Sequence, residues 1–156
     1  MIINNSTKYK MDSALKESIA LFPTDGLTIE LKYCPKGSSR YASGTYYRKT
    51  TNFENGKFIR IRINQFNRYP VEVNFKTSQY EKKKDFKGRE KIYQKLRFVK
   101  LHTPEDLILA IFLHEFSHYL DHIECRNGRY KQTKADKFAV DILEKLEVIS
   151  QVKKIT

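Results

Sequence analysis

The sequence predicts an α+β fold: a helix, then a small, mostly antiparallel sheet, then two further helices. Two observations carry this prediction. Between residues 27 and 77, short segments alternate apolar and polar residues, which is the period of a half-buried strand. Between residues 103 and 146, longer segments repeat apolar residues at the spacing of a helix. A chain of 156 residues is long enough for one core, so we expect residues 1–156 to form a single domain.

The N-terminal half contains the first predicted helix and four predicted strands. Residues 12–22 begin with a capping Asp12 or Ser13, carry an apolar stripe and end before Pro23, as expected for a short helix. The predicted strands are LTIELKYC (27–34), GTYYRKTT (44–51), FIRIRIN (58–64) and VEVNFKT (71–77), with a turn at Glu54-Asn55-Gly56. Because apolar residues fall on one side of these strands, we expect an antiparallel sheet with one face on the core.

Residues 81–100 are strongly basic, and their pattern does not decide between helix and strand. They carry nine Lys or Arg against three acids, with Phe86, Tyr93 and Phe98 interleaved. This segment is either a solvated basic insertion or a nucleic-acid groove in which aromatic rings stack on bases. The whole chain has a formal charge of +12, which favours contact with polyanions and makes nucleic acid a candidate partner.

Two helices are predicted in the C-terminal third, and the first should lie at the centre of the domain. Thr103 is a capping residue, Pro104 takes the first helical position, and two acids follow in the first turn. This helix should run to about residue 124, and it is apolar nearly all round. An Asn-Gly turn separates it from a helix starting near Lys131. The expected buried stripe of that helix is Ala135, Phe138, Ala139, Ile142, Leu143 and Leu146.

The first of these two helices contains an HExxH motif at residues 114–118. Residues four apart lie on one helix face, so His114 and His118 can point at the same ion, and zinc prefers such nitrogen ligands. Glu115 projects from the neighbouring flank, where its carboxylate can act as general base on a water activated by the metal. The alternative is two core histidines bonded to backbone carbonyls. Buried polar groups on so apolar a helix need partners, which favours a Zn²⁺ site.

The third ligand must come from another element. Asp121 and His122 lie about 10 Å or more further along a straight helix from His114, too far to share its ion. The second helix offers Gln132 and Asp136, four residues apart. Asp136 is the better ligand by charge and is the one we expect. If Gln132 binds the metal instead, Asp136 would orient a histidine from behind.

The residues HEFSHYLDH and KADKFAVDIL resemble the zincin metallopeptidases. They are most similar to small intracellular proteins of the ImmA/IrrE type and the SprT-like type, which combine HExxHxxxH with a later ExxADxFA-like helix. The resemblance covers residues 112 to about 143. It implies a minimal zincin-like fold and peptidase activity, and the SprT-like resemblance implies proteolysis near DNA. In ImmA/IrrE-type proteins a zinc-binding glutamate matches Gln132, so this chain departs from the pattern there.

The sequence therefore predicts a zinc-dependent peptidase with Zn²⁺ on His114, His118 and Asp136 and with Glu115 as catalytic base. A protein or peptide substrate could add as a strand to an exposed sheet edge, for which FIRIRIN is the candidate. Two alternatives remain. One is an inactive zincin that binds a partner protein. The other is a basic nucleic-acid-binding protein with a closed structural metal site that uses His122 or Cys125.

The chain carries no sign of a membrane or of export. No segment approaches the roughly 18 apolar residues of a membrane span, and the first residues do not read as a secretory signal. The two cysteines, Cys34 and Cys125, are expected to be reduced thiols. We therefore expect a cytoplasmic protein.

Overall fold

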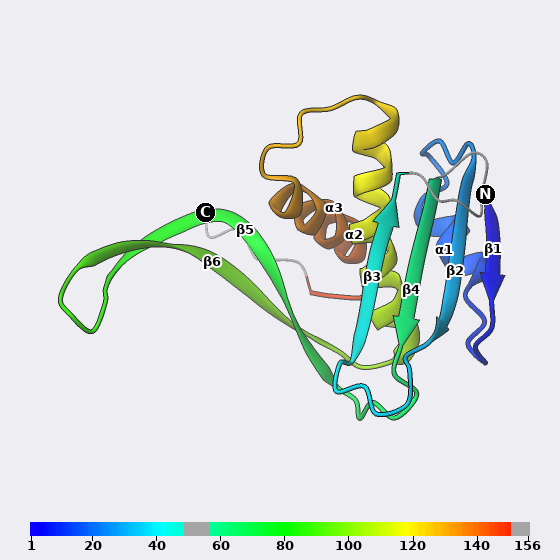
Figure 1. The fold of residues 1–156 in the computed structure, drawn as a ribbon, viewed down its shortest axis with the longest axis horizontal. Helices are drawn as coiled ribbons and strands as arrows, with labels where there is room; N and C mark the ends of the chain where they lie inside the picture. The colour runs from blue at the N-terminus through cyan, green and yellow to red at the C-terminus, as the bar shows by residue number, and fades with distance from the viewer. Residues whose placement is uncertain (49–56, 151–156) are drawn as a thin grey trace.

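A computed structural model describes residues 1–48 and 57–150 and confirms the α+β class (Figure 1). The predicted turn at residues 54–56 and the end of the strand predicted over residues 44–51 lie outside the described residues. The elements are β1 (Ile2–Asn5), α1 (Asp12–Ser18), β2 (Leu27–Tyr33), β3 (Ala42–Tyr47), β4 (Lys57–Ile63), β5 (Val71–Lys84), β6 (Glu90–Leu101), α2 (Pro104–Ile123) and α3 (Lys131–Lys145).

The main sheet has the strand order β1-β2-β4-β3, and it is mixed. The expected antiparallel pairing holds for β3 with β4 and for β5 with β6, whereas β1–β2 and β2–β4 are parallel. The reason is the path of the chain. It returns through α1 between β1 and β2, and through the oppositely directed β3 between β2 and β4. Alternation of apolar residues reveals a strand's buried face but not the direction of its neighbours.

The expectation that FIRIRIN forms a sheet edge is wrong. It forms β4, which pairs with β2 on one side and with β3 on the other, so its main-chain groups are already used. The free edge next to the helices belongs to β3 (Figure 1). A strand that adds to this side of the sheet would therefore pair with β3.

The core lies between the main sheet and α2, as the apolar surface of that helix predicts. Phe112, Phe116 and Tyr119 are completely buried along α2. The helix begins as expected, since the Thr103 hydroxyl accepts a hydrogen bond from the Asp106 backbone N–H at 3.1 Å. The helix α3 packs against α2 and β5, with Ala139 among its fully buried residues. Among the described residues, none of the helices is both long and apolar enough to span a membrane.

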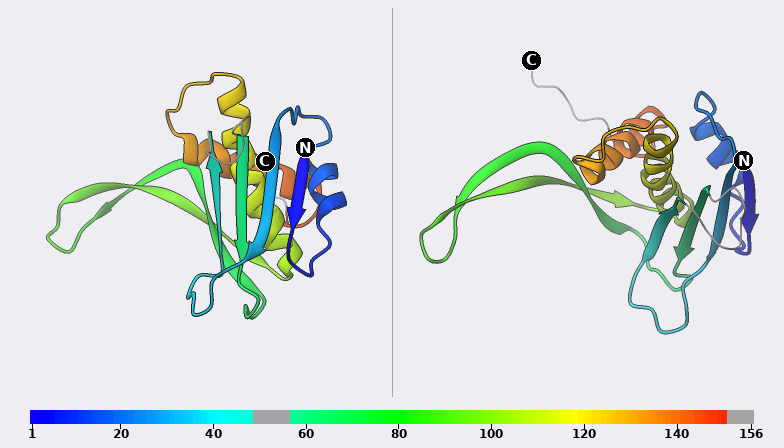
Figure 2. Two further views of the ribbon diagram at one scale, coloured as in Figure 1. Left: turned by 45° about the vertical axis from the view of Figure 1, so that its right-hand side comes forward. Right: turned by 45° about the horizontal axis from the view of Figure 1, so that its top comes forward.

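The basic segment over residues 81–100 is extended rather than helical. It forms the outer part of β5 and most of β6, a long two-stranded hairpin that leaves the body of the molecule (Figures 1 and 2). The base of this hairpin belongs to the core, where Val71, Phe75 and Leu101 are buried. The hairpin therefore has a packed base and an exposed outer part.

Candidate metal centre

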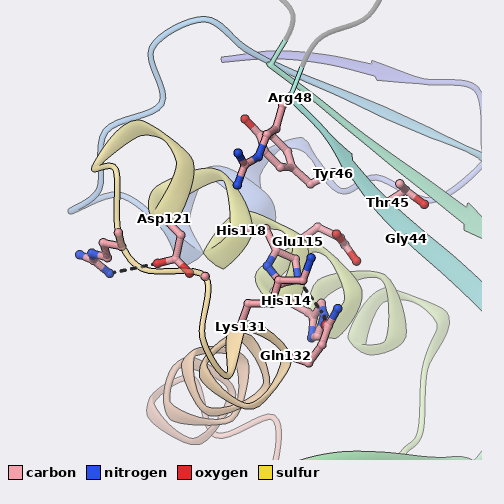
Figure 3. Close-up of a pocket in the computed structure, with 12 residues that line it drawn as sticks. Gly44, Thr45, Tyr46, Arg48, His114, Glu115, His118, Asp121, Lys131 and Gln132 are labelled. Atoms are coloured by element: carbon pink, nitrogen blue, oxygen red, sulfur yellow. Dashed lines mark hydrogen bonds and ion pairs between the residues drawn. The ribbon is translucent and has the colours of Figure 1, made fainter.

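The two histidines of the motif lie one turn apart on α2 and point toward α3 (Figure 3). Their ring centroids are 4.9 Å apart with an interplanar angle of 80°, and the two Nε2 atoms are 3.2 Å apart. Two nitrogens bound to one tetrahedral zinc at ordinary bond lengths would be separated by about 3.3 Å. The pair thus already has the spacing of one edge of a zinc tetrahedron.

Gln132, in the first turn of α3, supplies the third converging atom. Its Oε1 lies 2.8 Å from the Nε2 of His114, the same nitrogen that faces His118. Two imidazole nitrogens and an amide oxygen form a neutral set of three donors. Three protein ligands with a fourth position left for water or substrate is the composition of catalytic zinc sites.

Asp136 lies on the other side of the His114 ring. Its Oδ1 is 2.6 Å from Nδ1 of His114, and its Oδ2 accepts a hydrogen bond from the Lys76 backbone N–H at 2.7 Å. Both carboxylate oxygens therefore have partners away from the His118 side. In this arrangement Asp136 orients His114, and Gln132 occupies the position that we expected Asp136 to fill.

This hydrogen bond also fixes which His114 nitrogen offers a lone pair. A carboxylate can only accept, so the Nδ1–H of His114 donates to Asp136. In a neutral ring the Nε2 lone pair then faces the amide of Gln132, which can turn either its NH2 group or its oxygen toward this nitrogen. With the NH2 group turned inward the amide donates to Nε2, and with the oxygen turned inward the two atoms can share a cation. The donor set therefore fits zinc.

The surroundings of the two imidazoles move their pKa values in opposite directions. Burial by itself lowers the pKa of His114, but the hydrogen bond and charge of Asp136 outweigh burial and raise that pKa above its ordinary value. Burial and the charge of His114 lower the pKa of His118. Of the two rings, His114 therefore takes up a proton more readily than His118, and a metal ion would compete with that proton.

Glu115 sits beside the histidines and against β3. Its side chain is buried, and burial raises the pKa of its carboxyl, while the charge of His114 and a hydrogen bond from the Tyr46 backbone act in the opposite direction. A carboxylate whose pKa is raised toward neutrality is better matched to taking and returning a proton. Its place on the flank agrees with the motif, which puts it beside the two histidines and on a different side of the helix.

Gly44 allows β3 to approach α2 closely at this point. A Cβ atom at residue 44 would lie 2.4 Å from Cγ2 of Ile111 and 3.0 Å from Cγ of Glu115. Any larger side chain would therefore push the sheet edge away from the helix that carries the histidines. The sequence offers a weak signal here, because glycine inside a strand often marks a close backbone approach.

Two cavities meet at the histidines. One, of about 460 Å³, is polar and is lined by Arg48, Asp121, Arg126 and Lys131 beside the motif residues (Figure 3). The other, of about 370 Å³, lies between β3 and the base of β5, and apolar side chains line much of it. Both are lined in part by Gly44, His114, Glu115 and Gln132. A chain lying along β3 would therefore meet a polar and an apolar cavity on the two sides of Glu115.

The other residues considered from the sequence lie outside this cluster. Nδ1 of His122 is 2.7 Å from the hydroxyl of Tyr46, Asp121 pairs with Arg126, and Cys125 is exposed beyond the end of α2. Over residues 1–48 and 57–150, no group of three His, Cys, Asp or Glu side chains is arranged to hold a metal. A closed site built with His122 or Cys125 is therefore not assembled here, and the three-donor cluster depends on an amide.

Comparisons with protein-family models, with curated proteins and with solved structures found no match to this chain.

Proposed function

We propose that this protein is a zinc-dependent peptidase of the zincin type. The observation that carries the proposal is the convergence of His114 Nε2, His118 Nε2 and Gln132 Oε1 beside the buried carboxylate of Glu115. A pair of core histidines would explain the ring contacts, but it would not explain a glutamate held next to them at the junction of two cavities.

Each residue has a distinct part in the proposed reaction. His114, His118 and Gln132 would hold zinc, which supplies an activated water and polarises the peptide carbonyl. Glu115 accepts the proton of the attacking water and delivers it to the leaving amine as the C–N bond breaks. Asp136 keeps His114 in the tautomer that presents Nε2 to the cluster.

The proposed substrate is a peptide or an unfolded protein segment bound in extended form. The outer edge of β3 runs along α2, and apart from the Tyr46 backbone group bonded to Glu115 it offers main-chain hydrogen bonds to an added strand. Such a segment would pass Glu115 between the polar and the apolar cavity. Arg48 and Lys131 favour acidic side chains in the polar cavity, where Arg126 is already paired with Asp121 and Glu124.

The two cysteines bear on the location of the protein. The free thiols Cys34 and Cys125 fit a reducing compartment, and we propose the cytoplasm as the location.

The alternative of a nucleic-acid-binding protein with a structural metal is less favoured, because the converging donors line a cavity instead of being enclosed. The other alternative is an inactive zincin that binds a protein partner. It stays in consideration because Gln132 stands where a glutamate ligand is expected in active proteins of the ImmA/IrrE type.

The test compares the zinc-loaded wild type with Glu115→Gln and with Glu17→Gln, a matched change at an exposed glutamate of α1. Fluorescein-labelled casein is the probe. We expect wild type and Glu17→Gln to release fluorescent peptides, and Glu115→Gln to lose at least about 100-fold of this activity while still binding zinc. Cleavage by Glu115→Gln at the wild-type rate would overturn the assigned base. Zinc-loaded wild type that binds casein without cleaving it would favour the inactive alternative.

A further inference from the structure

The outer part of the β5–β6 hairpin forms an arm, defined here as residues 80–96, that the proposed peptidase chemistry does not use (Figures 1 and 2). The arm carries seven Lys or Arg against three acids. It also exposes large apolar side chains that a solvated loop would not need. These are Tyr80, Phe86, Ile92, Tyr93 and Leu96, between 42% and 94% exposed.

The tip of the arm is a well-formed turn. The carboxylate of Asp85 accepts hydrogen bonds from the backbone N–H groups of Lys87 and Arg89, each at 2.9 Å, and Gly88 supplies the positive φ of 77° that the turn requires. Phe86, which is 94% exposed, therefore projects from a fixed backbone. An aromatic ring presented in this way is suited to contact a partner.

Positive charge lies on both faces of the arm. Lys82 is opposite Ile92 and Lys83 is opposite Lys91, and successive residues of a strand point to opposite faces. Lys82 and Lys84 therefore extend on one face, and Lys83 and Lys91 on the other. Within the described part of the chain, Lys82, Lys84 and Lys87 form none of the ion pairs, and the side chain of Lys87 contacts only the exposed ring of Phe86, with its Nζ 5.6 Å from the ring centroid. Their charges are therefore not neutralised by acidic groups of the chain.

These charges select the class of partner. A second copy of the chain is disfavoured because each copy carries a formal charge of +12. A membrane surface would contact only one face of the arm. A groove with phosphates along both walls contacts both faces at once, and the major groove of B-form DNA is wide enough for a two-stranded β-ribbon.

We propose that the arm binds duplex DNA by entering the major groove. Lysines on both faces neutralise phosphates on the two groove walls, and Phe86 at the tip reaches the base edges, where an aromatic ring can contact thymine methyl groups. This binding does not require the metal centre.

The arm is anchored to the body at the element that carries Gln132 and Asp136. The amide of Gln94 donates to the Thr133 hydroxyl of α3 at 2.8 Å, and Arg97, the residue that follows the arm on β6, pairs with Glu144 of the same helix. DNA held by the arm would therefore have a fixed position relative to α3.

The test measures the affinity of the full chain for a short fluorescent DNA duplex at several salt concentrations. The variant Lys82→Gln/Lys84→Gln/Lys87→Gln is compared with Lys8→Gln/Lys10→Gln/Lys16→Gln, which removes the same charge from exposed positions near α1. We expect the arm variant to bind at least about tenfold more weakly and to lose about three units from the slope of log affinity against log salt. The control should change affinity less than about threefold.

Two further measurements separate groove binding from other binding. Phe86→Ala should weaken duplex binding with an unchanged salt slope, since it removes a base contact and no charge. Equal weakening by the two triple variants would overturn the proposal in favour of diffuse charge attraction. Tighter, arm-dependent binding of the matching single strand would overturn the groove assignment, and an unchanged affinity of Phe86→Ala would overturn the role of the tip.

Discussion

Gln132 is the residue that most distinguishes this site. An amide oxygen is a weaker and uncharged ligand compared with a carboxylate, so the zinc proposed here would keep more of its positive charge. The larger residual charge strengthens the polarisation of a bound carbonyl. The weaker bond to the amide oxygen lowers the affinity of the site for zinc. Asp136 would partly compensate for the weak amide ligand, because its hydrogen bond to Nδ1 makes the His114 ring a stronger ligand.

Asp136→Asn tests the orienting role. An asparagine of the same size no longer presents a charged acceptor to the His114 Nδ1–H, so we expect zinc affinity to fall by about 10- to 100-fold while the site can still be filled. Competition with a zinc indicator measures this change. Asp141→Asn, an exposed position on the same helix, is the control and should leave affinity unchanged. If both variants bind zinc like wild type, Asp136 does not position His114.

At the scale of elements, the site depends on how closely β3 lies to α2. Gly44 permits this approach, and the same strand supplies the sheet edge and the backbone next to Glu115. The close contact between β3 and α2 therefore supports the packing of the core and also places the backbone of β3 beside Glu115.

Gly44→Ala should destabilise the fold by about 1–3 kcal/mol, because the new methyl group overlaps Ile111 in a packed region. The free energy of unfolding in urea measures the effect. Gly128→Ala is the control, since a Cβ atom there meets nothing within 4 Å, and it should change stability by less than about 0.5 kcal/mol. Equal stability of the two variants would mean that β3 can move away at no cost.

The helices and most strands could be predicted from the sequence because their signals are local. Thr103 and Pro104 mark the start of α2, and alternation marks β2 and β4. The strand β1, the parallel pairings and the hairpin over residues 81–100 were not predicted. Pairing depends on contacts between segments far apart in the sequence, and the exposed hairpin lacks the one-sided apolar pattern that identifies a strand.

The candidate site shows the same division. The motif His114-Glu115-His118 could be read from its spacing, since one helix turn determines its geometry. The choice between Gln132 and Asp136 could not, because it depends on the rotation of α3 against α2. The backbone N–H of Lys76 holds Asp136 on the far side of His114, and no side-chain pattern reports such a contact.

The proposed peptidase site and the proposed DNA-binding arm lie in separate parts of the molecule. The histidine cluster and its cavities lie at the junction of the sheet edge with α2 and α3, whereas the basic arm extends away from the body (Figure 1). The elements that join them are the base of β5 and α3. A molecule of this form could hold DNA on the arm and a peptide at the histidines at the same time.

The proposed metal centre is best tested by measuring the zinc content of the purified protein by elemental analysis. Protein saturated with zinc and freed of excess metal should contain about one zinc per chain as wild type and as His102→Ala, an exposed histidine that serves as control. His118→Ala and Gln132→Ala should lose this zinc, and Asp136→Ala should retain it at saturation. Zinc lost from Asp136→Ala but kept by Gln132→Ala would reverse the two roles, and wild type without zinc would contradict the metal centre altogether.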